Sequence, residues 1–295
     1  METTTSSFKL VKRIKDDKFN VDHLHYYYLL LQIGTQNFQM CVADPRKNHC
    51  LLLESYQFEK VGNVEELIQI LSKIFENHHL LMAGFWAGVK MAVKNDIFTL
   101  VPSSVFDKDS INQYLALNAV VDEENIQSLY YKHAKTEAIN VFGVERKLID
   151  WVFSIYKKIK VQVVHHGSAF IEGILRNDDH THDKSIFLLV EGHQLQVVVT
   201  RDKKLLYYNQ FTSQNVNDLM KYVLLIMKAL KLDQNTSKVL VWGDINNESA
   251  FFKLLYKYTR NISFGNKPAY LRFNYMFDEL FDHQYFGLYS LYLCD

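Results

Sequence analysis

Cysteine and proline are both scarce in this sequence. Three prolines and three cysteines occur among its 295 residues. Cys41, Cys50 and Cys294 form no Cys-x-x-Cys pair, which argues against a zinc ribbon or a disulfide scaffold and fits a reducing compartment. Because no Gly/Ser-rich linker occurs either, the domain boundaries must be located from the hydrophobic pattern.

Net charge and long apolar runs are absent as well. Lys plus Arg and Asp plus Glu number 33 each, so no long-range field attracts nucleic acid or an anionic membrane. No run approaches the ~18 apolar residues that cross a bilayer, and the opening METTTSSFKLVKRIK lacks the apolar core of a signal peptide. We therefore expect a cytoplasmic protein with no membrane span and no nucleic-acid partner.

Apolar residues, in contrast, are abundant, at 48% of the chain, and one pattern of them occurs twice. An apolar strand ends in a glycine turn, an alternating strand and a third strand follow, and then come a helix and another apolar strand. The two copies span residues 26–85 and 185–243. The glycines that end the first and last strands are Gly34 and Gly84 in one copy and Gly192 and Gly243 in the other.

The helix in each copy begins in the same way. Asn63 and Asn215 are natural N-caps, and an acidic residue three positions later, Glu66 or Asp218, favours the first turn. The recurring order of strands, cap and glycines predicts an internal duplication.

The remaining segments set the predicted domain boundaries. Residues 1–176 form a first lobe with a hairpin and helix insertion around 86–142, whose hairpin turns at Lys94-Asn95-Asp96. Residues 177–183, NDDHTHD, are the predicted hinge. They hold a His-x-His pair of the kind that binds transition metals, but a solvated hinge is favoured and no metal site is predicted. Residues 184–295 form the second lobe, whose aromatic C-terminal segment either packs into the core, which is favoured, or forms a surface for a partner.

Two units of three antiparallel strands, helix and strand resemble the ribonuclease H-like lobes of the actin, hexokinase and chaperone ATPase superfamily. The segments FTLVP, LLYYNQF, VLVWGDI and the aromatic tail ending in Cys294 further resemble a family of uncharacterised bacterial proteins with an actin-like ATPase fold. The resemblance covers nearly the whole chain. It implies an α/β fold of two such lobes and no particular activity.

The resemblance also implies a nucleotide cleft formed by Gln32, Gly34, Thr35, Gly192 and Gly243. Active members of the superfamily have an Asp-x-Gly-Thr turn whose Asp helps to hold a hydrated divalent cation. This chain has Gln32-Ile33-Gly34-Thr35, and a neutral amide supplies no charge for a hard cation.

The second half departs from the superfamily pattern too. Val190 occupies the position of its acid, and the neighbouring Glu191 is offset by one residue, which aims its carboxylate away from where that acid would sit in the cleft. Asp244 follows Gly243, where the superfamily commonly has a second glycine, and its side chain is expected to obstruct the site.

These departures predict a non-catalytic protein with a degenerate cleft, no catalytic residues and no cofactor, which acts as an adaptor or scaffold for an unidentified protein partner. One alternative is a switch that binds ATP without turnover. Another is an active ATPase or small-molecule kinase that uses ATP with magnesium and the displaced acids Glu191 or Asp244.

Overall fold

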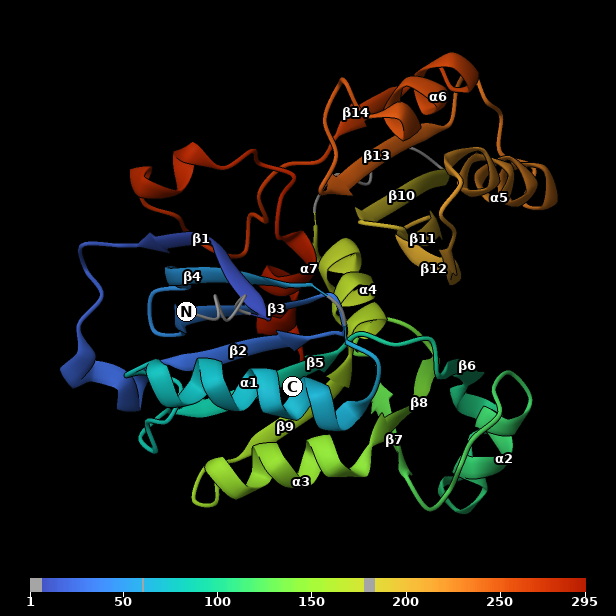
Figure 1. The fold of residues 1–295 in the computed structure, drawn as a ribbon. Coiled ribbons are helices and arrows are strands. Elements are labelled where there is room, and N and C mark those ends of the chain that lie inside the picture. The colour runs from blue at the N-terminus through green and yellow to red at the C-terminus, as the bar shows by residue number, and fades with distance from the viewer. Residues whose placement is uncertain (1–6, 60, 178–183) are drawn as a thin grey trace, which may run out of the picture.

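The computed structural model describes residues 7–59, 61–177 and 184–295. In these residues two mixed sheets lie on either side of a central pair of helices, and a small third sheet flanks the first (Figure 1). The same order of three antiparallel strands, a helix and a parallel strand recurs in both large sheets, as the sequence pattern predicts. No helix in the described ranges has the length and apolarity needed to span a bilayer.

The first sheet has six strands. From edge to edge they are β1 (Phe8–Lys15), β4 (His49–Phe58), β3 (Asn37–Asp44), β2 (Tyr28–Ile33), β5 (Gly88–Val93) and β9 (Val161–His165). β2, β3 and β4 are antiparallel neighbours, whereas β5 runs parallel to β2 and β9 parallel to β5. Almost every residue of β2 is buried because helices cover both faces of the sheet, which explains its continuous apolar sequence.

Two contacting helices, α1 (Val64–Asn77) and α3 (Arg146–Ile155), cover one face of this sheet (Figure 1). The Asn63 side chain accepts a hydrogen bond from the Glu66 amide at 2.9 Å, as expected of an N-cap. The short helix η1 (Val21–Tyr26) connects β1 to β2.

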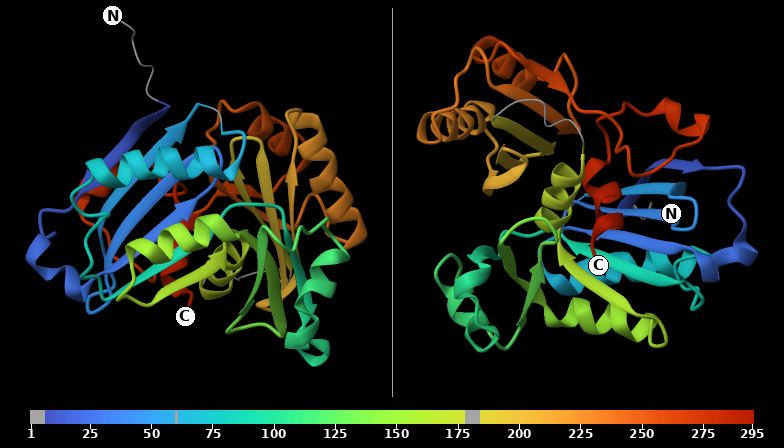
Figure 2. Two further views of the ribbon diagram at one scale, coloured as in Figure 1. Left: turned by 60° about the horizontal axis from the view of Figure 1, so that its bottom comes forward. Right: turned by 180° about the vertical axis from the view of Figure 1, so that it is seen from behind.

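The second sheet has five strands in the order β12 (Lys204–Thr212), β11 (Gln194–Arg201), β10 (Lys184–Glu191), β13 (Lys238–Gly243) and β14 (Ile262–Phe264). Its outer helices are α5 (Val216–Ala229), capped by Asn215, and α6 (Ala250–Tyr258). Between the two large sheets lie α4 (His166–Arg176) and α7 (Phe286–Ser290), which contact each other and strands of both sheets (Figure 2).

Two predictions about residues 80–102 are wrong. The strand after α1 is β5, not residues 80–84, which form turns with hydrogen bonds from Leu81 to His78 and from Ala83 to Leu80. β5 and β6 (Phe98–Pro102) do not form a hairpin either, because β5 pairs with β2 and β9 whereas β6 pairs with β8 (Ala138–Glu145). Both errors arise because strand pairing is decided by distant segments.

The small sheet has the order β6, β8 and β7 (Ile126–Lys132). It packs with the short helix α2 (Ile111–Ala116), and the 3-10 turns η2 (Ser103–Val105) and η3 (Lys108–Ser110) precede that helix.

The aromatic C-terminal segment returns to the first sheet although it follows the second sheet in the sequence. It comprises η4 (Tyr275–Glu279), α7 and η5 (Leu291–Leu293). α7 contacts β2 and β3, and η5 contacts β5. Phe277, Phe286 and Tyr289 are buried, as predicted, in a core that also contains Trp242 of β13, whereas Phe281 is 63% exposed. The predicted hinge lies outside the described residues except for Asn177.

Candidate nucleotide cleft between the lobes

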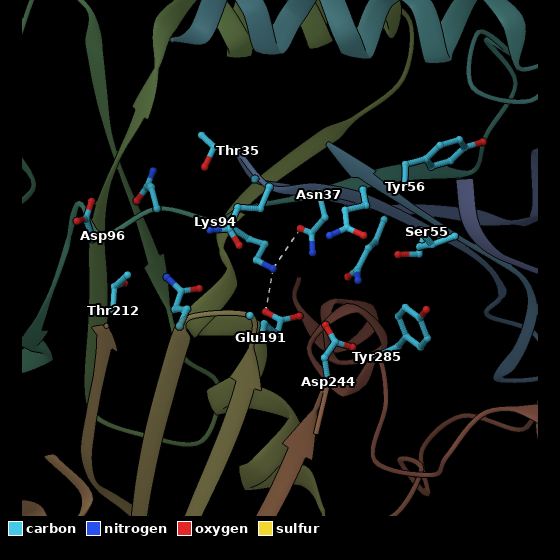
Figure 3. A pocket seen from close by; sticks show the side chains of 18 residues that line it. Thr35, Asn37, Ser55, Tyr56, Lys94, Asp96, Glu191, Thr212, Asp244 and Tyr285 are labelled. Carbon is cyan, nitrogen blue, oxygen red and sulfur yellow. Dashed lines mark hydrogen bonds and ion pairs between the residues drawn. The ribbon is translucent and has the colours of Figure 1, made fainter. Parts of the chain in front are cut away.

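A cavity of about 450 Å³ lies where the β2–β3 hairpin of the first sheet meets the β10–β11 hairpin of the second (Figure 3). Gly34, Thr35 and Gly192 line it, whereas Gln32 and Gly243 do not. Its remaining lining is mostly amide, hydroxyl and charged: Val11, Gln36, Asn37, Gln39, Ser55, Tyr56, Gln57, Lys94, Asn95, Asp96, Glu191, Gln194, Thr212, Asp244 and Tyr285.

Gln32 is buried, with 1% of its surface exposed. Its side-chain amide nitrogen donates to Gln39 Oε1 at 3.2 Å and lies 3.5 Å from Glu191 Oε1. The amide therefore joins the first hairpin to the second lobe, and it carries no charge with which to hold a cation.

Lys94 fills the centre of the cleft, whereas the sequence pattern predicts it only as part of a hairpin turn. Its ammonium lies 2.9 Å from Glu191 Oε2 and donates to Asn37 Oδ1 at 3.2 Å, and the Lys94 and Glu191 side chains are about a tenth exposed (Figure 3). A Cβ on Gly34 would lie 3.1 Å from Lys94 Cβ, so the glycine allows this close approach. Lys94 follows β5 directly and lies beside the hairpin because its amide donates to the Ile33 carbonyl.

Glu191 points into the cleft, whereas the neighbouring Val190 is buried in the core of the second lobe, so the two side chains point in different directions, as alternation along β10 predicts. Glu191 is the last residue of β10, where the tight turn at Gly192 (φ +58°) leads into β11. Alternation along a strand decides only on which face of its own sheet a side chain lies. The groups that contact Glu191 come from the other lobe and are Lys94 and Gln32.

Asp244 extends into the same cavity and is open to it (Figure 3). Desolvation by the surrounding protein, followed by repulsion from Glu191, raises its pKa to about 6, and Lys94 opposes this rise only in part. Among the described residues Asp244 has no ion pair, so of the two displaced acids only Glu191 has a cationic partner in that part of the chain.

Position 243 requires glycine because the backbone of β10 packs closely against it. It has a φ of +107°, and a Cβ there would collide with the Val190 carbonyl. Its amide donates to the His283 carbonyl at 2.8 Å, and the Asp244 amide donates to the Val190 carbonyl at 2.8 Å. The C-terminal segment thus occupies the backbone donor of Gly243, and two residues further along it Tyr285 (φ +59°) lines the cavity.

One lysine, Lys94, and three acids, Asp96, Glu191 and Asp244, are the charged residues that line the cleft. In the described residues no three His, Cys, Asp or Glu side chains gather as metal ligands. Lys94 is neutralised by Glu191, and Asp96 and Asp244 add negative charge that repels phosphate.

Two helix-covered mixed sheets whose first hairpins face each other across a cleft define the actin-like ATPase fold. The chain is similar to a Bacteroides thetaiotaomicron protein with an actin-like ATPase fold and unknown function, with a TM-score of 0.75 and 15% identity over 94% of this chain and 99% of that one. It is also similar to a chain of the PilM–PilN type IV pilus biogenesis complex, with a TM-score of 0.58 and 12% identity over 90% and 97% of the two chains. At these identities the likeness shows the fold alone.

The particular family follows from the sequence. The chain belongs to the family described as protein of unknown function (DUF3822), whose model matches residues 16–262. Among curated proteins, none matches this sequence.

Proposed function

We propose that this protein is a non-catalytic member of the actin-like fold that acts as an adaptor or scaffold by binding another protein. The observation that carries the proposal is the pairing of Lys94 with Glu191 at the centre of the cleft, beside a neutral Gln32. A metal-nucleotide complex needs carboxylates free to face its cation, and here the Glu191 carboxylate is held by Lys94.

The C-terminal segment supports the same proposal. Its His283 carbonyl accepts the hydrogen bond of the Gly243 amide, at the strand end matching the adenosine-binding strand of the superfamily. A nucleotide at that strand end would have to displace a segment whose Phe286 and Tyr289 are buried in the core. The likeness to a chain of the PilM–PilN complex is compatible with a role in a protein assembly.

A melting experiment with ATP and magnesium tests the proposal. A ligand present at 100 times its dissociation constant stabilises a protein by about 2.7 kcal/mol, which a thermal shift detects. We expect no shift at millimolar ATP, with or without magnesium, and no release of phosphate. Magnesium without nucleotide is the control for effects of the ion alone.

The two alternatives predict different results. A switch without turnover is favoured by the open glycine turns at Gly34 and Gly192, and it requires an ATP-dependent shift without phosphate release. An active ATPase requires magnesium-dependent release that Glu191→Gln or Asp244→Asn abolishes. Either result would replace the adaptor proposal.

A further inference from the structure

Strand β1 forms one edge of the six-stranded sheet and hydrogen-bonds only to β4 within that sheet (Figure 1). An edge strand offers backbone N–H and C=O groups that can pair with an added strand, and proteins usually protect such edges. In β1 most side chains from Lys9 to Arg13 are exposed, whereas the side chains of the central strands are buried.

A bulge at Val11 gives this edge an apolar centre on both faces of the sheet. Leu10 pairs with Tyr56 and Lys12 with Ser55, so Val11 is the extra residue between them. Leu10 and Val11 are 39% and 45% exposed, and Val11 also lines the mouth of the interlobe cavity. An apolar residue on an added strand can therefore pack on either side of the edge.

Basic residues flank this apolar centre. β1 carries Lys9, Lys12, Arg13 and Lys15 and no acidic residue. Lys12 pairs with Glu279 and Arg13 with Glu54, whereas Lys9 and Lys15 have no ion-pair partner in the described part of the chain. The Arg13 side chain remains 50% exposed despite its contact with Glu54.

We propose that β1 is a docking edge for an extended acidic segment of a partner protein, which adds to the sheet as a further strand. The segment has apolar residues at its centre, facing Leu10 and Val11, and acidic residues on either side, facing Lys9 at one end and Arg13 and Lys15 at the other. Backbone pairing supplies affinity, and the side chains supply selectivity. This proposal rests on the adaptor function proposed above and names the chemistry of the partner.

A second copy of the chain is a poorer occupant of the same edge. Two β1 strands paired with each other would bring four basic residues against four others, and like charges opposite each other destabilise strand pairs. An acidic peptide carries the opposite charge and is attracted to the same edge.

Selection from a library of random ten-residue peptides tests the proposal, with the full chain as bait. We expect the enriched peptides to be acidic with an apolar centre. One enriched peptide, labelled with a fluorophore, should bind at least tenfold more weakly to the double variant Lys9→Glu, Lys15→Glu than to the wild type. Its binding should also weaken as salt is raised, because the charges are exposed.

The matched control is Lys157→Glu, Lys158→Glu, which changes the net charge equally at exposed positions after α3. It should change the affinity by less than twofold, and a peptide with lysine in place of its acidic residues should bind the Lys9→Glu, Lys15→Glu variant better than the wild type.

Enrichment of non-acidic peptides, or of none, would overturn the proposal. Equal losses in both variants, displacement of the peptide by single-stranded RNA, or a dimer that the Lys9→Glu, Lys15→Glu variant dissolves would do so too. None of these results depends on nucleotide, so they are distinguishable from failure of the adaptor proposal, which ATP binding would reveal.

Discussion

At the scale of single residues, the properties of the cleft follow from three side chains. Gln32 is a buried neutral amide, Lys94 is a cation already paired, and Asp244 is an acid without a cationic partner among the described residues. An amide at position 32 carries no charge, and the Lys94 ammonium lies 2.9 Å from Glu191 Oε2 at the centre of the cleft. The charged groups that line the cleft are Lys94, Asp96, Glu191 and Asp244.

Asp244 gives the cleft a measurable pH dependence. Its pKa in the folded protein, about 6, lies above its usual value of 3.8, so the folded protein binds more protons than the unfolded chain between these values. Ionised Asp244 therefore destabilises the fold, and its contribution to the free energy of unfolding falls as pH rises from 4 to 6.

We expect Asp244→Asn to gain stability relative to the wild type as pH rises from 4 to 7. The gain should be about 1 kcal/mol or less, because the side chain is open to water in the cavity. Urea unfolding at pH 4, 5, 6 and 7 measures it, with Asp150→Asn, an exposed site on α3, as the control. An equal stability difference at every pH would contradict the raised pKa.

At the scale of elements, local signals predicted most of the fold. The caps Asn63 and Asn215 and the glycine turns at Gly34 and Gly192 are short-range features, and the structure contains all four. The position of β5 and the partner of β6 depend on distant strands, and there the predictions fail. The cleft residues on the two hairpins could be predicted because glycine turns are local signals. The role of Lys94 could not be predicted, because Lys94 follows β5 and the position of β5 depends on its pairing with β2.

The two central helices depend on a glycine contact between them. A Cβ on Gly173 of α4 would collide with Ser290 Oγ of α7 and lie 2.9 Å from the Phe286 ring. We expect Gly173→Ala to lower the free energy of unfolding by about 1–3 kcal/mol, because overpacking forces the helices apart.

Gly84→Ala is the matched control, since no atom lies within 4 Å of a Cβ at that position. We expect it to change the free energy of unfolding by less than about 0.5 kcal/mol. Urea denaturation compares the two variants, and equal effects would show that the contact between α4 and α7 is not close.

At the scale of the whole molecule, the Lys94–Glu191 pair and the Gln32 amide couple the two lobes. In a double-mutant cycle of Lys94→Gln and Glu191→Gln, we expect a coupling energy of about 1–3 kcal/mol, because the pair is largely shielded from water. Each single variant leaves one charge unpaired. The stability losses of the two single variants should therefore sum to more than the loss in the double variant. Equilibrium unfolding measures the cycle, and a coupling energy of zero would mean that the pair does not join the lobes.

The return of residues 275–295 to the first sheet has a consequence for synthesis in the cell. The strands and helices of the first lobe are complete by Arg176, about a hundred residues before the segment that covers the face of β2 and β3. At about 5–20 residues per second, the ribosome needs roughly 5–20 seconds to supply that cover. During this interval the nascent chain presents an apolar sheet surface, to which we expect chaperones to bind.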